Sequence, residues 1–132
     1  MSDDSDSVHE NSEPQRSRTG PLHFIDGLKY SLKGYRAAWV HAEAFRQELA
    51  VFAIAVVVAV FVGDSGLERA LLIGILFPVL ITELINTAIE TVVDRVSTEH
   101  HELSGRAKDL ASAAVFTSII AAATVWLLVI FS

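Results

Sequence analysis

Acidic and amide side chains recur on one face of the segment ITELINTAIETVVDR, residues 81–95, whose other positions are largely apolar. Intervals of 3, 4 and 4 residues separate Glu83, Asn86, Glu90 and Asp94. On a helix of about 100° per residue, these four side chains fall within an arc of about 80°. One carboxylate on such a face could hold Mg²⁺ against the phosphate oxygens of ATP, and another could accept the proton of an attacking hydroxyl. The pattern is therefore suited to phosphoryl transfer.

Side chains that could bind phosphate follow in the segment HHELSGRAKD, residues 100–109. Arg106 and Lys108 could pair with phosphates, and His101 could donate a hydrogen bond. The sequence contains neither of the familiar phosphate-binding loops, GxxxxGK[ST] or the kinase GxGxxG. Gly105 stands where a zinc-protease HExxH motif needs its second histidine, and there is no cysteine for thiol chemistry or disulfides. A kinase with this sequence would therefore use a different phosphate site.

Three apolar stretches must position these groups, in a sequence that is 52% hydrophobic with a mean hydropathy of +0.44. The stretches predict membrane-spanning helices at about 42–62, 67–93 and 108–131, with a turn at the Gly63–Gly66 tetrapeptide. A carboxylate in the hydrocarbon costs about 2.5–3.5 kcal/mol on insertion scales. The acidic face is therefore expected to turn toward a partner, water or a metal ion. Self-association would shield it, which gives a physical motive for an oligomer with shared sites.

An amphipathic helix is expected at about 22–39, ahead of the spans. Its apolar residues Ile25, Leu28, Leu32, Tyr35 and Trp39 are spaced by 3 and 4, with lysines and an arginine elsewhere around it. This pattern favours a helix on the membrane surface. Residues 1–19 are expected to form a disordered acidic tail, and residues 20–132 a single membrane domain. The net charge of −6 and the lack of a long basic run argue against nucleic acid as a partner.

The distribution of basic residues predicts the orientation. Lys29, Lys33, Arg36 and Arg46 lie shortly before the first apolar run, which begins at Leu49, and the loop between the first two spans offers only Arg69. Three more, Arg95, Arg106 and Lys108, lie between the second and third apolar runs. The positive-inside rule then places the N-terminus and the 94–109 segment in the cytoplasm, and the C-terminus in the periplasm. Both polar regions would meet on the side of the membrane where ATP is found.

Two long strings, GYRAAWVHAEAFRQE (34–48) and ELINTAIETVVDRVSTEHHELSGRAKDLASAAV (83–115), closely resemble the prokaryotic diacylglycerol kinase family. The resemblance extends from about Gly20 to the end of the sequence. It implies an all-α, homotrimeric enzyme of the bacterial inner membrane, with an N-terminal surface helix and three transmembrane helices per chain. The implied reaction transfers the γ-phosphate of MgATP to diacylglycerol and yields phosphatidic acid.

The resemblance also assigns roles to individual positions. It implies Glu83 as the catalytic base, with Asn86 beside it, and Glu90 as a metal ligand that contacts ATP through Mg²⁺. The implied nucleotide-binding positions are Tyr30, Glu90, Glu99, His100, His101, Lys108, Asp109 and His23. The implied lipid-binding positions are Arg36, Ala37, Ala38, Trp39, Ala44, Phe45, Arg46, Gln47, Glu48 and Ser112.

The sequence departs from the family pattern at two positions. The family commonly reads NEAAFRQE before the first span, with its first glutamate a second metal ligand, whereas this sequence reads HAEAFRQE. Ala42 occupies the aligned position and Glu43 is shifted by one residue, or about 100° around a helix. We expect Glu43 to reach the metal through a local adjustment. The second departure is His23, which stands where some relatives carry an arginine near ATP.

Three other functions remain open at this point. An undecaprenol kinase would perform the same chemistry on a longer isoprenoid alcohol. A channel or transporter subunit would line an ion path with Glu83 and Glu90. A catalytically inactive structural homologue would explain Ala42.

Overall fold

The computed structural model describes residues 21–96 and 101–131, and these form helices joined by short connections, with no strand. The chain divides into two units, residues 1–32 and 33–132. Helix α1 (Pro21–His41) contains residues of both units, and within it the Ser31 hydroxyl donates to the Gly27 carbonyl at 3.0 Å. A helix in this region agrees with the periodicity of its apolar residues, and its position at the membrane surface stays a prediction.

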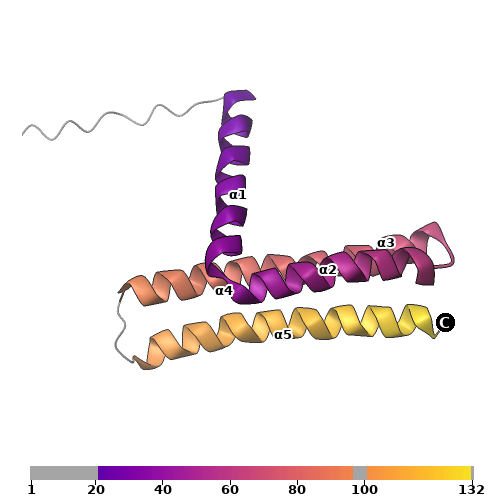
Figure 1. Cartoon of the computed structure of the whole chain (residues 1–132). Coiled ribbons are helices and arrows are strands. Elements are labelled where there is room, and N and C mark those ends of the chain that lie inside the picture. Colours follow the sequence, from indigo (N-terminus) through magenta and orange to yellow (C-terminus); the bar gives the residue numbers. More distant parts are fainter. Residues whose placement is uncertain (1–20, 97–100, 132) are drawn as a thin grey trace, which may run out of the picture. The chain divides into compact units, whose positions relative to one another are not determined.

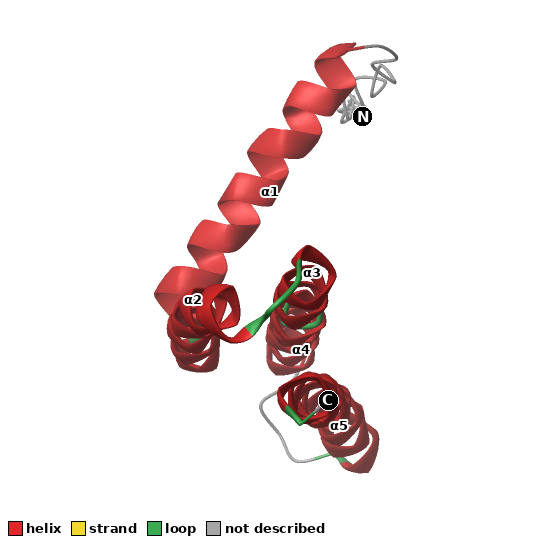
Figure 2. Ribbon diagram, turned by 90° about the vertical axis from the view of Figure 1, so that its right-hand side faces the viewer, coloured by secondary structure: helices red, strands yellow, loops and turns green. Residues whose placement is uncertain are grey.

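The second unit holds three segments that are long and apolar enough to cross a membrane: residues 43–62, 66–96 and 102–130. They comprise α2 (Glu43–Val62), α3 (Gly66–Gly74) with α4 (Phe77–Val96), and α5 (Glu102–Ile130). Figure 1 shows α3 and α4 running in the direction opposite to α2 and α5, and Figure 2 shows them between those two helices. The all-α fold with three candidate spans per chain is confirmed.

The exterior of this unit is apolar along most of the spans. Phe61 is 83% exposed, and Phe116 and Leu128 are 65% and 68% exposed. The side chains enclosed between the helices are small, with alanines predominating among the buried apolar residues. A soluble protein rarely exposes so large an apolar surface, whereas a bilayer is the appropriate solvent for it.

A capped turn joins α2 to α3. The Ser65 hydroxyl accepts a hydrogen bond from the Glu68 amide at 3.2 Å, and the Glu68 carboxylate accepts one from the Asp64 amide at 2.8 Å. This arrangement resembles a capping box, except that the Glu68 carboxylate accepts from the amide of Asp64, one residue before the N-cap Ser65. Arg69 Nε donates to the Gly63 carbonyl at 2.9 Å, and a Cβ at Gly63 would lie only 2.8 Å from Arg69 Cγ. Glycine is therefore required where the side chain of Arg69 folds back over the turn.

The second span is not a continuous helix, because α3 ends at Gly74 and α4 begins at Phe77. Pro78 supplies the cause, since it has no N–H to donate to the carbonyl four residues earlier. At the break, the Leu76 amide bonds instead to the Ile73 carbonyl at 3.2 Å, in the tighter i→i+3 pattern. The sequence had predicted one uninterrupted helix through this region.

Two polar contacts link the second span to α5. The Leu72 carbonyl, released from the amide of Leu76 by the break, accepts a hydrogen bond from Trp126 Nε1 at 3.1 Å. One turn inside α4, the hydroxyls of Thr82 and Ser118 lie 2.9 Å apart. Hydrogen bonds of this kind between transmembrane helices contribute on average about 0.6 kcal/mol each. They help to fix α4, and with it the acidic face, against α5.

Candidate functional site

The polar face of α4 is turned inward at its centre. Glu83 is 4% exposed and Asn86 is 9% exposed, although both lie on a helix whose opposite face is open. The Thr87 hydroxyl donates to Glu83 Oε1 at 3.4 Å, and Asn86 Nδ2 donates to Glu90 Oε1 at 3.3 Å. The polar residues along this face thus support one another in pairs one helical turn apart.

A pocket of about 330 Å³ lies against this face. One wall is α4, from Glu83 to Asp94, and the other is the junction of α1 and α2. At that junction Ala42 adopts an extended backbone, φ −106° and ψ 107°, so the chain bends and presents the junction to α4. The lining residues are His41, Ala42, Glu43, Ala44, Glu83, Asn86, Thr87, Glu90, Thr91 and Asp94.

The pocket offers oxygen donors for a divalent cation. Glu43, Glu83 and Glu90 contribute carboxylates to its lining, and Asn86 Oδ1 is buried without a hydrogen-bond partner. Within residues 21–96 and 101–131, no three His, Asp or Glu side chains converge closely enough to form a complete metal site. That arrangement fits Mg²⁺, which usually takes one or two carboxylates and completes its shell with water and substrate phosphates. It does not fit a cation held by protein ligands alone.

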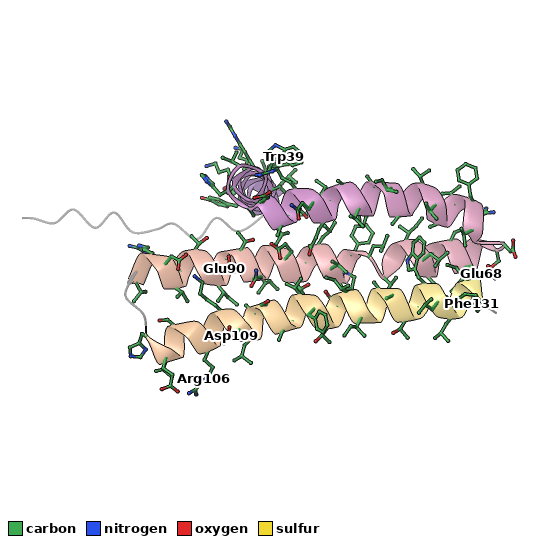
Figure 3. All side chains as sticks on the ribbon, turned by 60° about the horizontal axis from the view of Figure 1, so that its bottom comes forward. Trp39, Glu68, Glu90, Arg106, Asp109 and Phe131 are labelled. Carbon is green, nitrogen blue, oxygen red and sulfur yellow. The ribbon has the colours of Figure 1, made fainter. Side chains whose placement is uncertain are left out.

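Basic residues lie at the same end of the spans as this pocket. Lys108 on α5 pairs with Asp94 on α4 through a 2.7 Å contact between Nζ and Oδ1. Arg106 pairs with Glu102 one turn away at 2.8 Å, and the His101 imidazole caps α5 by accepting from the Leu103 amide. Figure 3 shows Glu90, Arg106 and Asp109 at the same end of α4 and α5, opposite to Glu68 and Phe131. Acidic and basic groups therefore gather at one end of the spans.

The expected nucleotide positions are only partly brought together. Glu90 lines the pocket and Lys108 reaches it through Asp94. Asp109 is exposed on α5, and Tyr30 belongs to the first unit. Glu99 and His100 lie outside the described residues, as does the side chain of His23.

The expected lipid-binding positions separate into three groups. Ala38 and Phe45 are buried, where they pack with Ala42, and Phe45 also contacts the ring of Tyr35. Arg46 donates to the Trp39 carbonyl at 2.9 Å and so braces the bend between α1 and α2. The other expected lipid-binding residues are exposed or line a pocket: Arg36, Ala37, Ala44, Gln47, Glu48 and Ser112.

Sequence reasoning missed His41 and Thr91 as lining residues of the polar pocket. Thr91 lies one turn beyond Thr87 on the same helix, so its position could have been read from the periodicity. His41 could not, because its place depends on the bend at Ala42. Trp126 is half-buried and donates to the Leu72 carbonyl, a contact between distant residues that the sequence does not reveal.

Comparisons with known proteins agree with one another. The family model described as prokaryotic diacylglycerol kinase matches residues 29–130. The chain is 47% identical over 114 residues to the diacylglycerol kinase of Escherichia coli (strain K12), covering 86% of this chain and 93% of that protein. It is 44% identical over 108 residues to the diacylglycerol kinase of Haemophilus influenzae, covering 82% and 92%. The corresponding figures for the diacylglycerol kinase of Pseudomonas aeruginosa are 41% over 113 residues, 86% and 92%.

Proposed function

This chain belongs to the prokaryotic diacylglycerol kinase family, and from that premise we propose how its polar pocket phosphorylates a lipid. The chain is a diacylglycerol kinase, an enzyme of a bacterial membrane that converts diacylglycerol to phosphatidic acid. We propose ATP as the phosphoryl donor and Mg²⁺ as the cofactor. The observation that carries this assignment is the buried pair Glu83 and Asn86, held on a membrane helix beside a pocket rich in carboxylates.

Glu83 is proposed as the base that takes the proton of the lipid hydroxyl. It is buried among apolar helices, where a lipid alcohol can arrive without leaving the bilayer, and its carboxylate accepts a hydrogen bond from the neutral Thr87 hydroxyl. Asn86 lies one turn further toward the polar end and has a free Oδ1. That oxygen can accept a hydrogen bond from the attacking hydroxyl or from a water on the metal, so Asn86 is assigned to positioning.

Phosphate binding is assigned to the open end of the pocket. Glu90 and Glu43 would hold Mg²⁺, which supplies charge neutralisation across the phosphate oxygens. Lys108 already stands at this end in its pair with Asp94, from which it can turn to a phosphate oxygen. Transfer to the lipid then needs only that the hydroxyl and the phosphate meet between Glu83 and Glu90, which are separated by about two helical turns.

Glu43 is proposed to supply the second metal carboxylate in place of the residue that the family carries at position 42. We expect Glu43→Gln to raise the Mg²⁺ concentration for half-maximal activity about tenfold or more, because even supporting partners of metal ligands change affinity by about 10–100-fold. Glu102→Gln, at an exposed site outside the pocket, is the matched control. The measurement is activity against free Mg²⁺ at saturating ATP. An unchanged Mg²⁺ titration for Glu43→Gln would show that Glu43 is not a metal ligand. If Glu43 is a ligand, adding Ala42→Glu to the Glu43→Gln variant should restore the affinity for Mg²⁺.

The environment of the enzyme is assigned by two further proposals. The distribution of lysine and arginine favours the inner membrane with the N-terminus and the pocket in the cytoplasm, and the C-terminus in the periplasm. The apolar exterior and the acidic face of α4 favour self-association that completes and shields the site, and the resemblance to the family implies that the oligomer is a homotrimer. Reaction of single introduced cysteines with a membrane-impermeant reagent would test the first proposal, and light scattering in detergent the second.

The assay that tests the function uses the purified protein, MgATP labelled at the γ-phosphate, and either diacylglycerol or undecaprenol. We expect labelled phosphatidic acid, with little label in undecaprenyl phosphate, because the relatives are named diacylglycerol kinases. Label in undecaprenyl phosphate alone would transfer the assignment to the isoprenoid alcohol. Label in neither lipid would favour the inactive homologue or the ion-path alternative.

A further inference from the structure

Among the described residues that line the polar pocket, His41 alone carries an imidazole, and it faces a lining rich in carboxylates. Lys108 and Arg106, at the same end of the spans, are both paired with acidic side chains. Within residues 21–96 and 101–131, no hydrogen bond or ion pair engages the His41 ring. Its nitrogens are therefore available to an ion or molecule that enters the pocket.

The end of α1 does not need this imidazole. A histidine in the last turn of a helix can serve the helix itself, by bonding to its final carbonyls. His41 is the last residue of α1, but Arg46 already donates to the Trp39 carbonyl at 2.9 Å. The Ala38 carbonyl accepts from the amide of Ala42 at 2.8 Å. The position of His41 is therefore better explained by the pocket than by the helix end.

The bend at Ala42 turns His41 toward the same pocket as Glu43. On a continuous helix their side chains would diverge by about 200°, since each residue turns the helix by about 100°. Ala42 is instead extended, and in an extended chain the two neighbours of a residue point to the same face. Both residues line the pocket. One wall therefore presents a nitrogen donor and a carboxylate from positions two residues apart.

The opposite wall gives an independent sign that a ligand enters here. Asn86 is 9% exposed, and its Oδ1 atom is buried without a hydrogen-bond partner. A buried polar atom is costly unless a partner reaches it, and a water bound to a metal would be such a partner. In the described parts of the chain, no three His, Asp or Glu side chains converge into a complete site. A cation in this pocket would therefore bring further ligands with it, as a nucleotide-bound metal does.

We propose that His41 binds the nucleotide-borne metal through a ring nitrogen, beside Glu43, and that it determines the metal preference of this enzyme. The inference rests on the function proposed above and deepens it, because it concerns which divalent cation the site selects. Oxygen ligands suit Mg²⁺ and Mn²⁺, whereas imidazole suits the later transition metals. In the string HAEAFRQE the histidine stands where NEAAFRQE has an asparagine, whose amide would offer only an oxygen. His41 therefore moves the preference from Mg²⁺ toward Co²⁺.

Pulsed electron paramagnetic resonance detects the proposed bond without turnover. The purified wild type is loaded with Mn²⁺ and a non-hydrolysable ATP analogue. We expect a nitrogen coupling to Mn²⁺ that changes when the histidines alone carry the heavier nitrogen isotope, which excludes the adenine ring as its source. His41→Asn should abolish the coupling. His9→Asn makes the same substitution outside residues 29–130, the region that the family model matches, and should retain it.

The metal preference is a second measure. Activity of the wild type and both variants is titrated with free Mg²⁺ and with free Co²⁺, at saturating ATP and diacylglycerol. The ratio of the half-maximal Mg²⁺ concentration to the half-maximal Co²⁺ concentration should fall about tenfold or more in His41→Asn, since even supporting partners of metal ligands change affinity by about 10–100-fold. His9→Asn should keep the wild-type ratio.

The outcomes separate this inference from the proposed function. A wild type that binds Mn²⁺ and the nucleotide without a histidine coupling would refute His41 as a ligand and leave the kinase assignment intact. A coupling that persists in His41→Asn would do the same, and an unchanged ratio in that variant would refute its role in metal preference. A wild type that neither binds Mn²⁺ with the nucleotide nor phosphorylates a lipid would refute the function, and this inference with it.

Discussion

Replacing Glu83 by Gln is expected to lower the turnover number by about 10²–10⁴-fold, the usual contribution of a general base, while the protein stays assembled. The amide keeps the shape of the side chain and its contact with Thr87, but it cannot accept the proton of the lipid hydroxyl. The turnover number at saturating diacylglycerol and MgATP checks the expectation, together with nucleotide binding by calorimetry.

Glu68→Gln is the matched control for that variant. It makes the same chemical change in the α2–α3 turn at the opposite end of the spans, and a capping box accepts either residue. Near wild-type turnover in Glu83→Gln would exclude Glu83 as the base. Lost turnover accompanied by lost nucleotide binding would indicate a structural role instead, because the base is not needed to hold ATP.

The second large effect is expected at Glu90. Glu90→Gln should raise the Mg²⁺ concentration for half-maximal activity by more than Glu43→Gln does, since Glu90 is proposed to contact both metal and nucleotide. It should also weaken MgATP binding while leaving the KM for diacylglycerol near the wild-type value. Titration of activity with Mg²⁺, and of the resting protein with MgATP, provides both numbers.

The link between Glu90 and Asn86 supplies an internal check. Asn86 Nδ2 donates to Glu90 Oε1, so Asn86→Ala would remove a hydrogen bond that holds the Glu90 carboxylate. Asn86→Ala should therefore also raise the Mg²⁺ concentration for half-maximal activity, but by less than Glu90→Gln does. A metal titration that is the same in Glu90→Gln and the wild type would contradict the assignment. If Glu90→Gln raises only the KM for diacylglycerol, Glu90 would be assigned to lipid binding instead of metal and nucleotide binding.

The sequence was sufficient for the spans and for the acidic face, because both follow from local rules. Hydropathy determines which segments prefer the bilayer, and a 3.6-residue period determines that Glu83, Asn86 and Glu90 share a side of the helix. Resemblance then identified the chemistry of that side. Neither source indicated that Phe45 is buried, where it packs with Ala38 and Ala42.

The unpredicted features depend on contacts between distant residues. The second wall of the polar pocket exists because the chain bends at Ala42, an alanine whose extended backbone no propensity scale would favour. A pocket between α2, α4 and α5 also depends on helix packing, because its lining, which includes Ala55 and Ala123, comes from helices of nearly uniform apolarity. When every face of a helix is hydrophobic, periodicity cannot identify the face that meets its neighbour. The break between α3 and α4 was not predicted, and the pairing of Trp126 with Leu72 could be read only from the packed structure.

The unequal lengths of the three spans link the enzyme to the thickness of its membrane. At about 1.5 Å per residue, the 20 residues of α2 cover about 30 Å, close to the hydrocarbon thickness of a bilayer. The other two spans, of 31 and 29 residues, are 11 and 9 residues longer than α2, and they extend past it at the end that bears Glu90 and Arg106 (Figure 3). Their surplus can absorb a thicker bilayer, whereas α2 has none, and its first residue is Glu43. In a thicker membrane, α2 would be too short to span the hydrocarbon layer, and the polar pocket at its first residue would lie below the headgroups. Hydrophobic mismatch would therefore act directly on the catalytic end of the protein.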